Sequence, residues 1–235
     1  TIDSVLQNRP QAFFPGSIQK KHLLSQTKNQ FFMALAQLTP AQWQQVFLTM
    51  QDQLVQKNIL LYSLEPKVQQ LIEAAGWDGS IQNTTDQPLF SFIESNVGIN
   101  KSNQWQDRTV ALDFSTPSQL VATITYTNHA PTEVALDQGR YVNYLRAVTP
   151  PDWQIQNVVV DDVVQTTQWQ TVATQSTAGV DFAETGGLIV VPPQATKTVV
   201  LTFAIPVNLE SLVIGKQPGL PKTKYNLITE DGARR

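Results

Sequence analysis

Cysteine is absent from this chain of 235 residues. The absence excludes disulfide bonds, thiolate nucleophiles and thiolate metal sites. Histidine is scarce as well: His22 and His129 are the two in the sequence, and they are far apart. They match no zinc-ligand spacing, and no serine lies in a G-x-S-x-G motif, so acyl-transfer chemistry and a histidine-built metal site are not expected. We predict no cofactor and no metal.

Charge is also low. Charged residues make up 15% of the sequence, against roughly 25% in an average domain, and the net charge is -3 with a pI of about 5.3. There is no run of Lys and Arg that could neutralise several phosphates on one face, so neither nucleic-acid binding nor attraction to a membrane surface is expected. Apolar residues reach 41%, which is enough for a buried core.

No apolar run approaches the roughly 20 residues that a membrane-spanning helix needs. The chain begins at Thr1 rather than Met and ends in the polar sequence "EDGARR". We therefore interpret it as a piece of a longer protein, whose contact with a membrane would come only through an N-terminal anchor outside this sequence.

The first third of the sequence has helical patterns. Apolar residues recur at three- and four-residue steps in 15–38 and in 39–54, where Thr39 is a candidate N-cap and Pro40 fits the first helical position. A further helix is predicted over 65–76, ended by Gly76 in the left-handed conformation. The short apolar runs "NILLYS" and "PLFSFIES" are interpreted as two buried strands.

Beyond Asp107 the period changes from helical to alternating. "QLVATITYTNH" and five further short segments alternate apolar and polar residues, separated by Pro, Gly, Asp and Asn. Asp161-Asp162 and Gly186-Gly187 are interpreted as hairpin turns, and residues 225–229 as the second strand of a last hairpin. The predicted fold is α+β, with a helical and mixed α/β region over 1–103 followed by an immunoglobulin-like antiparallel β-sandwich over 107–230.

The loop "SNVGINKSN" is the first candidate site. Asn side chains both donate and accept hydrogen bonds, which suits sugar hydroxyls, and a loop after a buried strand is a common place for ligands. The alternative is a turn, because Asn and Gly adopt left-handed backbone angles at low cost, and we rank the turn first. The ligand-binding hypothesis names Asn96, Asn100, Lys101, Asn103 and Arg108. For Lys101 and Arg108, ion pairs with Asp107 and Glu94 are the commoner outcome.

Tryptophans give the second candidate site. Trp105 and Trp153 lie near predicted loops, where an exposed indole face could stack on a sugar ring, whereas Trp169 alternates with polar neighbours and is predicted to be in the core. Core packing is the alternative for all three. No two carboxylates have a spacing that requires both at one site, so an acid–base pair is not expected.

Several motifs together resemble the C-terminal half of the bacterial domain-of-unknown-function family 4012. They are "NILLYSLEPKVQQLIEAAGWDG", "SNVGINKSNQWQDR", "ITYTNHA", "GRYVNYLRAVTP" and "KQPG", in that order, and they cover most of residues 55 to 230. The resemblance implies an extracytoplasmic, membrane-anchored protein of the bacterial cell envelope with no assigned activity. The upstream half of that family, which has a distant similarity to LytR-CpsA-Psr glycopolymer transferases, has no counterpart in this sequence.

We therefore expect a non-catalytic scaffold or recognition part of an envelope protein, whose partner is cell-wall glycan or another envelope protein. Two alternatives stay open: the C-terminal part of a glycan-transfer enzyme, and a carbohydrate-binding sandwich. The enzyme requires the Asn/Lys loop to border an open cationic cleft, and the carbohydrate module requires exposed Trp105 or Trp153. The scaffold requires an exposed apolar patch or a bare strand edge. The oligomeric state is not predicted.

Overall fold

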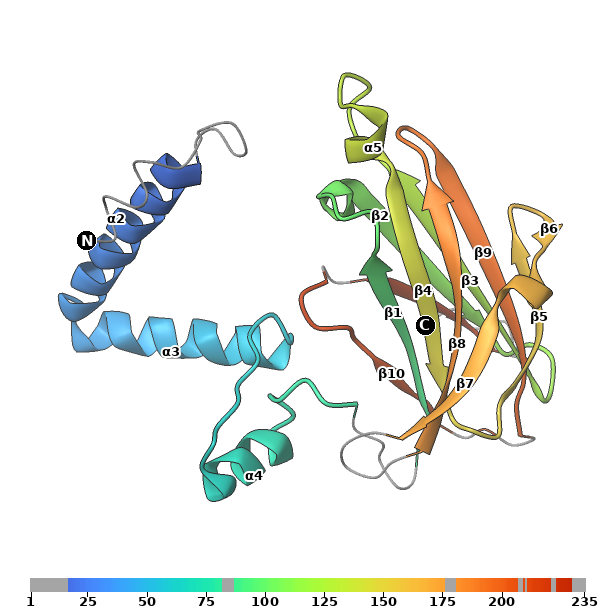
Figure 1. The fold of residues 1–235 in the computed structure, drawn as a ribbon. Helices are drawn as coiled ribbons and strands as arrows, with labels where there is room; N and C mark the ends of the chain where they lie inside the picture. The colour runs from blue at the N-terminus through green and yellow to red at the C-terminus, as the bar shows by residue number, and fades with distance from the viewer. Residues whose placement is uncertain are drawn as a thin grey trace. The chain divides into compact units, whose positions relative to one another are not determined.

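A computed structural model describes residues 17–81, 87–175, 181–206, 209, 211–220 and 223–229 (Figure 1). The chain divides into two compact units, Thr1–Asp52 and Gln53–Arg235. None of the described helices combines the length and the apolar character that a bilayer span requires.

Two helices make up the described part of the first unit. α2 is Ser17–Ala36, and α3, Pro40–Val55, begins there and ends just beyond it. Thr39 and Gln42 form a capping box at the start of α3: the Thr39 amide donates to Gln42 Oε1 at 2.8 Å, and the Gln42 amide donates to Thr39 Oγ1 at 3.4 Å. The predicted cap is therefore confirmed. Large apolar side chains of the two helices stay exposed, among them Phe31, Phe47 and Trp43.

The second unit opens with a short helical segment. α4, Pro66–Ala74, starts at a proline, and Gly76 follows it with φ +69°, the left-handed ending that the sequence predicts. The predicted strand over 58–63 is wrong, because these residues form an irregular segment. Leu60 and Tyr62 are exposed, and Leu61 instead donates its amide to the carbonyl of Trp77 at 2.8 Å.

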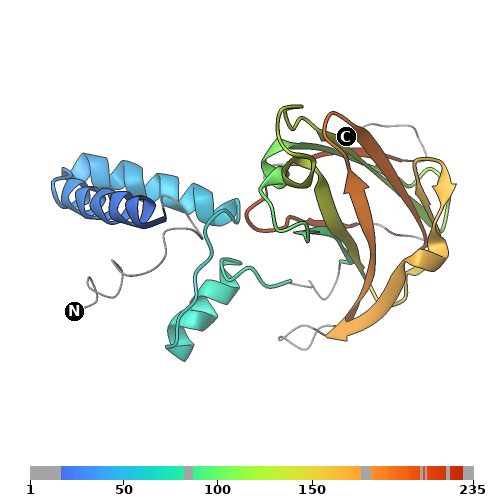
Figure 2. The same cartoon turned by 45° about the horizontal axis from the view of Figure 1, so that its top comes forward.

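Two β-sheets face each other in the rest of this unit (Figures 1 and 2), which confirms the predicted α+β fold with a β-sandwich. In the five-stranded sheet the order is β10-β1-β4-β8-β7, and in the six-stranded sheet it is β11-β2-β3-β9-β5-β6. The first sheet contains β1 Leu89–Asn96, β4 Tyr141–Thr149, β7 Gln170–Gln175, β8 Asp181–Val191 and β10 Val213–Gly215.

The second sheet contains β2 Gln106–Asp113, β3 Gln119–Asn128, β5 Gln154–Val160, β6 Val163–Val164, β9 Thr196–Ala204 and β11 Lys224–Ile228. Three short helical turns connect strands: η1 Ser102–Trp105, α5 Leu136–Gly139 and η2 Thr166–Gln168. Most neighbours are antiparallel. Two edge pairs are parallel, β1 with β10 and β2 with β11, so each sheet is mixed.

Three sequence interpretations change in this topology. β1 was assigned to the region before residue 103, yet its residues Ser91–Asn96 pair with β4, so the strand belongs to the sandwich. The predicted last hairpin is absent, because β10 joins one sheet and β11 the other. Gly186 and Gly187 lie within β8 rather than in a turn. The Asp161-Asp162 turn is confirmed, with φ +46° and +65° between β5 and β6.

The core lies between the sheets and is rich in aromatic rings. Phe90 of β1 contacts Phe203 of β9, with ring centroids 6.2 Å apart, and stacks near Trp153 at 6.3 Å. Trp169, predicted in the core, is 7% exposed. Its indole lies against Gly187: a Cβ at that position would sit 2.4 Å from two ring atoms. The glycine therefore leaves the space that the indole fills.

We predict that Gly187→Ala lowers the free energy of unfolding by about 1–3 kcal/mol, because the added methyl forces the buried Trp169 out of its position. Urea unfolding followed by circular dichroism measures the change. Leu188→Ala, at an exposed position on the same strand, serves as the matched control and should change the stability little. Equal stabilities for Gly187→Ala and the wild type would contradict the packing described here.

Candidate functional site

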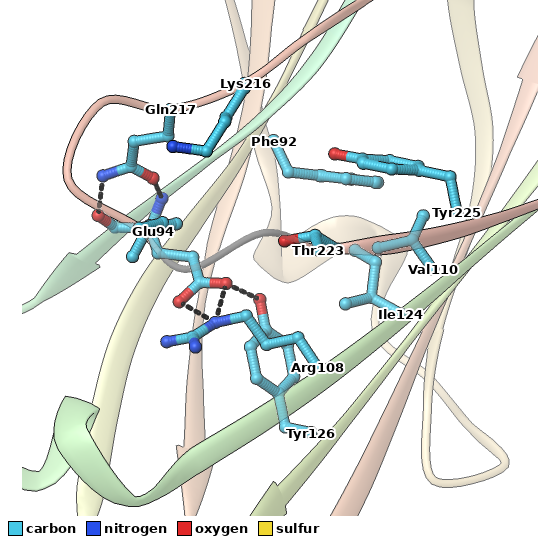
Figure 3. Close-up of a pocket in the computed structure, with 11 residues that line it drawn as sticks. Phe92, Glu94, Arg108, Val110, Ile124, Tyr126, Lys216, Gln217, Thr223 and Tyr225 are labelled. Carbon is cyan, nitrogen blue, oxygen red and sulfur yellow. Dashed lines mark hydrogen bonds and ion pairs between the residues drawn. The ribbon is translucent and has the colours of Figure 1, made fainter. Parts of the chain in front are cut away.

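Polar groups from both sheets meet inside the sandwich. Glu94 continues the inward-facing row of Phe90 and Phe92 on β1, and Arg108 occupies the corresponding inward row of β2. Both charged side chains are 6% exposed. Because β1 and β2 belong to different sheets, this ion pair joins the two layers of the sandwich (Figure 3).

Each oxygen of the Glu94 carboxylate accepts two hydrogen bonds. Arg108 Nε donates to Oε1 at 2.6 Å and to Oε2 at 2.7 Å. The hydroxyl of Tyr126 on β3 donates to Oε1 at 3.1 Å, and that of Tyr141 on β4 donates to Oε2 at 2.6 Å. Arg108 Nη1 donates to the carbonyl of Gln106 at 3.1 Å. We call Glu94, Arg108, Tyr126 and Tyr141 the inter-sheet cluster.

The electrostatics of the inter-sheet cluster favour one charged pair beside two neutral phenols. Burial, followed by the negative charge of Glu94, raises the pKa of both Tyr126 and Tyr141 well above the ordinary value. Burial works against the Arg108 guanidinium, but the hydrogen bond and charge of Glu94 outweigh it and raise the Arg108 pKa. Arg108 therefore stays protonated and the two phenols stay neutral at neutral pH, which is unlike a general acid–base pair.

Gln217 fixes the edge of β1 beside the cluster. Its side-chain Oε1 accepts from the Glu94 amide at 2.6 Å, and its Nε2 donates to the Glu94 carbonyl at 3.0 Å. β10 has already ended at Gly215, so the side-chain amide takes the place of the next strand residue and satisfies the backbone groups of Glu94.

A cavity of about 70 Å³ lies next to the inter-sheet cluster (Figure 3). Its walls are mostly apolar, with Phe92, Ile124 and Tyr225 among them. Lys216 lines it but directs its ammonium to the carbonyl of Gln56 at 2.7 Å. Ligand pockets usually measure about 300–1,000 Å³, so this cavity admits little more than a few water molecules.

The Asn/Lys loop is bonded to itself. Asn96 Nδ2 donates to the Asn100 carbonyl at 3.0 Å, and Asn96 Oδ1 accepts from the Gly98 amide at 3.1 Å. Asn100 Nδ2 donates to the carbonyls of Asp137 and Arg140 at 2.7 and 2.9 Å, while its Oδ1 accepts from the Ser102 hydroxyl at 2.6 Å. These amides shape the turn and tie it to α5.

The other predicted site residues do not form a common binding site. Lys101 is exposed, and Asn103 is an exposed residue whose Oδ1 lies 3.4 Å from Asn96 Nδ2. Arg108 is buried in an ion pair with Glu94 rather than open to an anion, which confirms the ion-pair alternative for this residue. Trp105 is half-buried, and Trp153 is 3% exposed. Trp153 therefore has no free face for a sugar ring, since it packs between Phe90 and Phe203.

Ile99 occupies the tip of the Asn/Lys loop at φ +54° and is 96% exposed. A β-branched side chain in the left-handed region is sterically costly, and full exposure gives it no compensating burial. The hydrogen bonds of Asn96 and Asn100 hold this conformation.

A groove of about 310 Å³ lies on the outer face of the five-stranded sheet. β4 contributes Tyr144 and Arg146, β8 contributes Glu184 and Gly186, and β7 forms the outer wall. Arg146 Nη1 donates to Glu184 Oε2 at 2.9 Å. A Cβ on Gly186 would lie 2.9 Å from Tyr144 Oη and 2.9 Å from Arg146 Cγ, so both side chains lie across the glycine. The remaining lining residues are Ser95, Gln170, Val172 and Thr174.

Our sequence reasoning missed this groove. Tyr144 and Arg146 are two outward positions of an ordinary strand pattern, and Gly186 was interpreted as a turn. The strand alternation of "RYVNYLRAV" was a usable signal, because it places Tyr144 and Arg146 on one face, opposite Leu145. The pairing of Arg146 with Gly186, which opens the groove, depends on the sheet register.

Comparison with known proteins adds little. No protein-family model and no curated protein matches the chain. A solved structure from Legionella pneumophila subsp. pneumophila str. Philadelphia 1, described as a "putative nutrient binding protein", is similar over 60% of this chain, with 10% identity and a TM-score of 0.34. The match spans 54% of that structure, about half its length, and at this TM-score it carries no functional argument.

We predict that Glu94→Gln lowers the free energy of unfolding by about 3–5 kcal/mol, because it leaves the buried Arg108 guanidinium without a counter-charge. Asp161→Asn is the control. It breaks the more exposed Lys197 pair, which should cost at most about 1 kcal/mol. Urea unfolding gives both values. Equal losses of unfolding free energy in the two variants would contradict a buried ion pair between Glu94 and Arg108.

A second prediction concerns alkaline pH. Since the pKa values of Tyr126 and Tyr141 are raised in the folded state, the folded protein binds these protons more tightly than the unfolded chain. Their contribution to stability is complete below pH of about 10, the unfolded pKa, and is lost as the pH rises further. Tyrosinate absorbance at alkaline pH should show phenols that ionise only on unfolding, and Tyr126→Phe with Tyr141→Phe should remove two of them.

A third prediction concerns the loop tip. Ile99→Asn should raise the free energy of unfolding by about 1 kcal/mol, because Asn adopts the left-handed conformation more readily and no packing is lost. Val97→Asn, on the same loop and also exposed, is the control and should not stabilise the protein. Thermal unfolding reports both, and a destabilised Ile99→Asn variant would mean that the isoleucine packs against the protein.

Proposed function

We propose that this chain is a non-catalytic recognition module that binds a neutral glycan in the groove on the outer face of the five-stranded sheet. The observation that carries the proposal is the groove itself, an open site of about 310 Å³ lined by an aromatic ring and by paired polar groups. In line with the family resemblance, we propose a bacterial cell-envelope protein, extracytoplasmic and anchored through a segment outside this sequence.

The chemistry of the groove suits a sugar. Tyr144 lies across Gly186, so one side of its ring rests on the sheet while the side chain remains half-buried rather than enclosed. An aromatic face of this kind packs against the apolar face of a pyranose. Arg146, Glu184 and Gln170 can donate to and accept from hydroxyl groups around the ring. One cation and one anion cancel, which favours a neutral ligand.

The reading as part of an enzyme has weaker support. The side chains most suited to proton transfer are buried in the inter-sheet cluster, where each carboxylate oxygen of Glu94 already accepts two hydrogen bonds. The asparagines that would form one wall of a transfer site use their amides within the loop and toward α5. Among the described residues, no three acidic or histidine side chains gather in a way that could hold a metal ion.

The carbohydrate-binding hypothesis from the sequence is retained, but its binding site is placed elsewhere. A site on Trp153 is not supported, since the indole is in the core. We propose the same class of ligand but place the contact at Tyr144 on the outer sheet face instead of at an exposed tryptophan. The scaffold alternative retains a specific observation in its favour, the open edge of β7, which leads to a separate inference below.

We predict that the wild-type chain sediments with purified bacterial cell-wall polymer and that Tyr144→Ala weakens this binding about tenfold or more, a loss of about 1.4 kcal/mol. Tyr62→Ala is the matched control, because it removes an exposed tyrosine outside the groove. Asn100→Ala combined with Lys101→Ala tests the loop.

The expected order is full binding by Tyr62→Ala, retained binding by the loop variant and reduced binding by Tyr144→Ala. Loss in the loop variant alone would move the site to the Asn/Lys loop. A wild-type chain that stays in the supernatant at every polymer concentration would overturn the glycan proposal and favour a protein partner.

A further inference from the structure

β7, Gln170–Gln175, forms one edge of the five-stranded sheet and pairs only with β8 (Figure 2). Five of its six residues are exposed. Beyond the ladder to β8, the backbone groups of these residues have no partner within the part of the chain that the structure describes. The outer side of β7 is therefore a row of free N–H and C=O groups, the arrangement that accepts an additional strand.

The other sheet edges are short or covered. β10 has three residues, and Gln217 completes its pairing with β1. β6 has two residues, and β11 begins at Lys224, a charged residue of the kind that keeps edges apart. β7 has none of these protections. Its sequence "QTVATQ" contains no charge and no proline.

The composition of β7 also suits pairing with itself. A two-fold axis between two antiparallel copies places each side chain opposite the same residue or one close to it, so a charged strand would repel its copy. β7 brings Thr, Val, Ala and Gln to such a contact. We propose that two copies of this chain associate through antiparallel pairing of their β7 edges.

The two-fold axis limits the register of this pairing. In an antiparallel pair, opposite residues point to the same face, and the axis stands perpendicular to the sheet. Two registers near the middle of β7 meet both conditions. Either Ala173 lies opposite its own copy, or Val172 lies opposite its own copy. In both, the two five-stranded sheets join into one continuous sheet.

Pairing through β7 brings the two outer-face grooves to the same side of that sheet. Gln170, Val172 and Thr174 line the groove from β7 itself, so the two grooves would adjoin across the new interface. A polymer with repeated units could then contact both copies at once, and the second contact would be intramolecular. The dimer does not depend on the glycan, since it uses the backbone edge.

Sedimentation velocity of the 235-residue chain without glycan tests the pairing. The wild type should shift from monomer to dimer as the concentration rises through the micromolar range, as expected for a small interface. Val172→Lys should remain monomeric, because it brings two ammonium groups together near the axis. Leu188→Lys makes the same change at a similarly exposed position of β8, away from the edge, and should dimerise like the wild type.

Cysteine cross-linking identifies the register, since the natural chain has no cysteine. Under mild oxidation, Ala173→Cys or Val172→Cys should give a covalent dimer, and Leu188→Cys should not. A wild type that is monomeric at every concentration would overturn the proposal, and so would a dimer that Val172→Lys leaves intact. Strand addition by an extended peptide, with no self-association, would assign the edge to a different protein instead.

Discussion

The buried carboxylate of Glu94 is the interaction on which the sandwich depends. It lies on the five-stranded sheet, yet it receives hydrogen bonds from Arg108 and Tyr126 of the six-stranded sheet as well as from Tyr141 of its own. A slip of β1 by one residue would turn the carboxylate to the outer face and leave the guanidinium unpaired inside. The ion pair therefore specifies the register of β1, a role better attested for buried charges than a large net gain in stability.

That register determines what the outer face presents. β1 pairs with β4 so that Ser95 stands opposite Tyr144, and β4 pairs with β8 so that Arg146 stands opposite Gly186. Tyr144 and Arg146 lie across this glycine because it has no side chain. Its neighbour Gly187 admits Trp169 on the inner side of the same strand. Two consecutive glycines thus open one space outward and one inward, because successive residues of a strand face opposite sides.

Local signals in the sequence predicted the local structure well. Thr39 and Pro40 indicated the start of α3, Gly76 indicated the end of α4, and the alternation of residues 119–129 indicated β3. The alternation of Trp169 with polar neighbours likewise predicted its place in the core. Each of these features depends on residues within a few positions of one another, so the local sequence is enough to predict it.

Contacts between distant segments could not be predicted in this way. The ion pair of Arg108 with Glu94 is a partial exception, because the sequence offered it as an alternative and the structure confirms it. Nothing in "FIES" or "QDR", however, shows that the two strands face each other from two sheets. The asparagines of the loop suggested a binding site by composition, yet Asn100 binds carbonyls near residue 140. The segments that form β10 and β11 are close in the sequence and therefore suggested a hairpin, but they pair in different sheets. Register and partner choice are properties of the whole sandwich.

We propose that the interior polar groups stabilise the fold while recognition takes place on the outer face. Nuclear magnetic resonance of the ¹⁵N-labelled chain, titrated with soluble cell-wall glycan fragments, tests it most directly. We expect shifts in the amide signals of Tyr144, Arg146 and Glu184, with the Arg108 Nε–H signal unchanged. Shifts in Arg108 Nε–H and in the Gln217 side-chain amide, with an unaffected outer face, would instead place the ligand between the two sheets and overturn the proposed outer-face site.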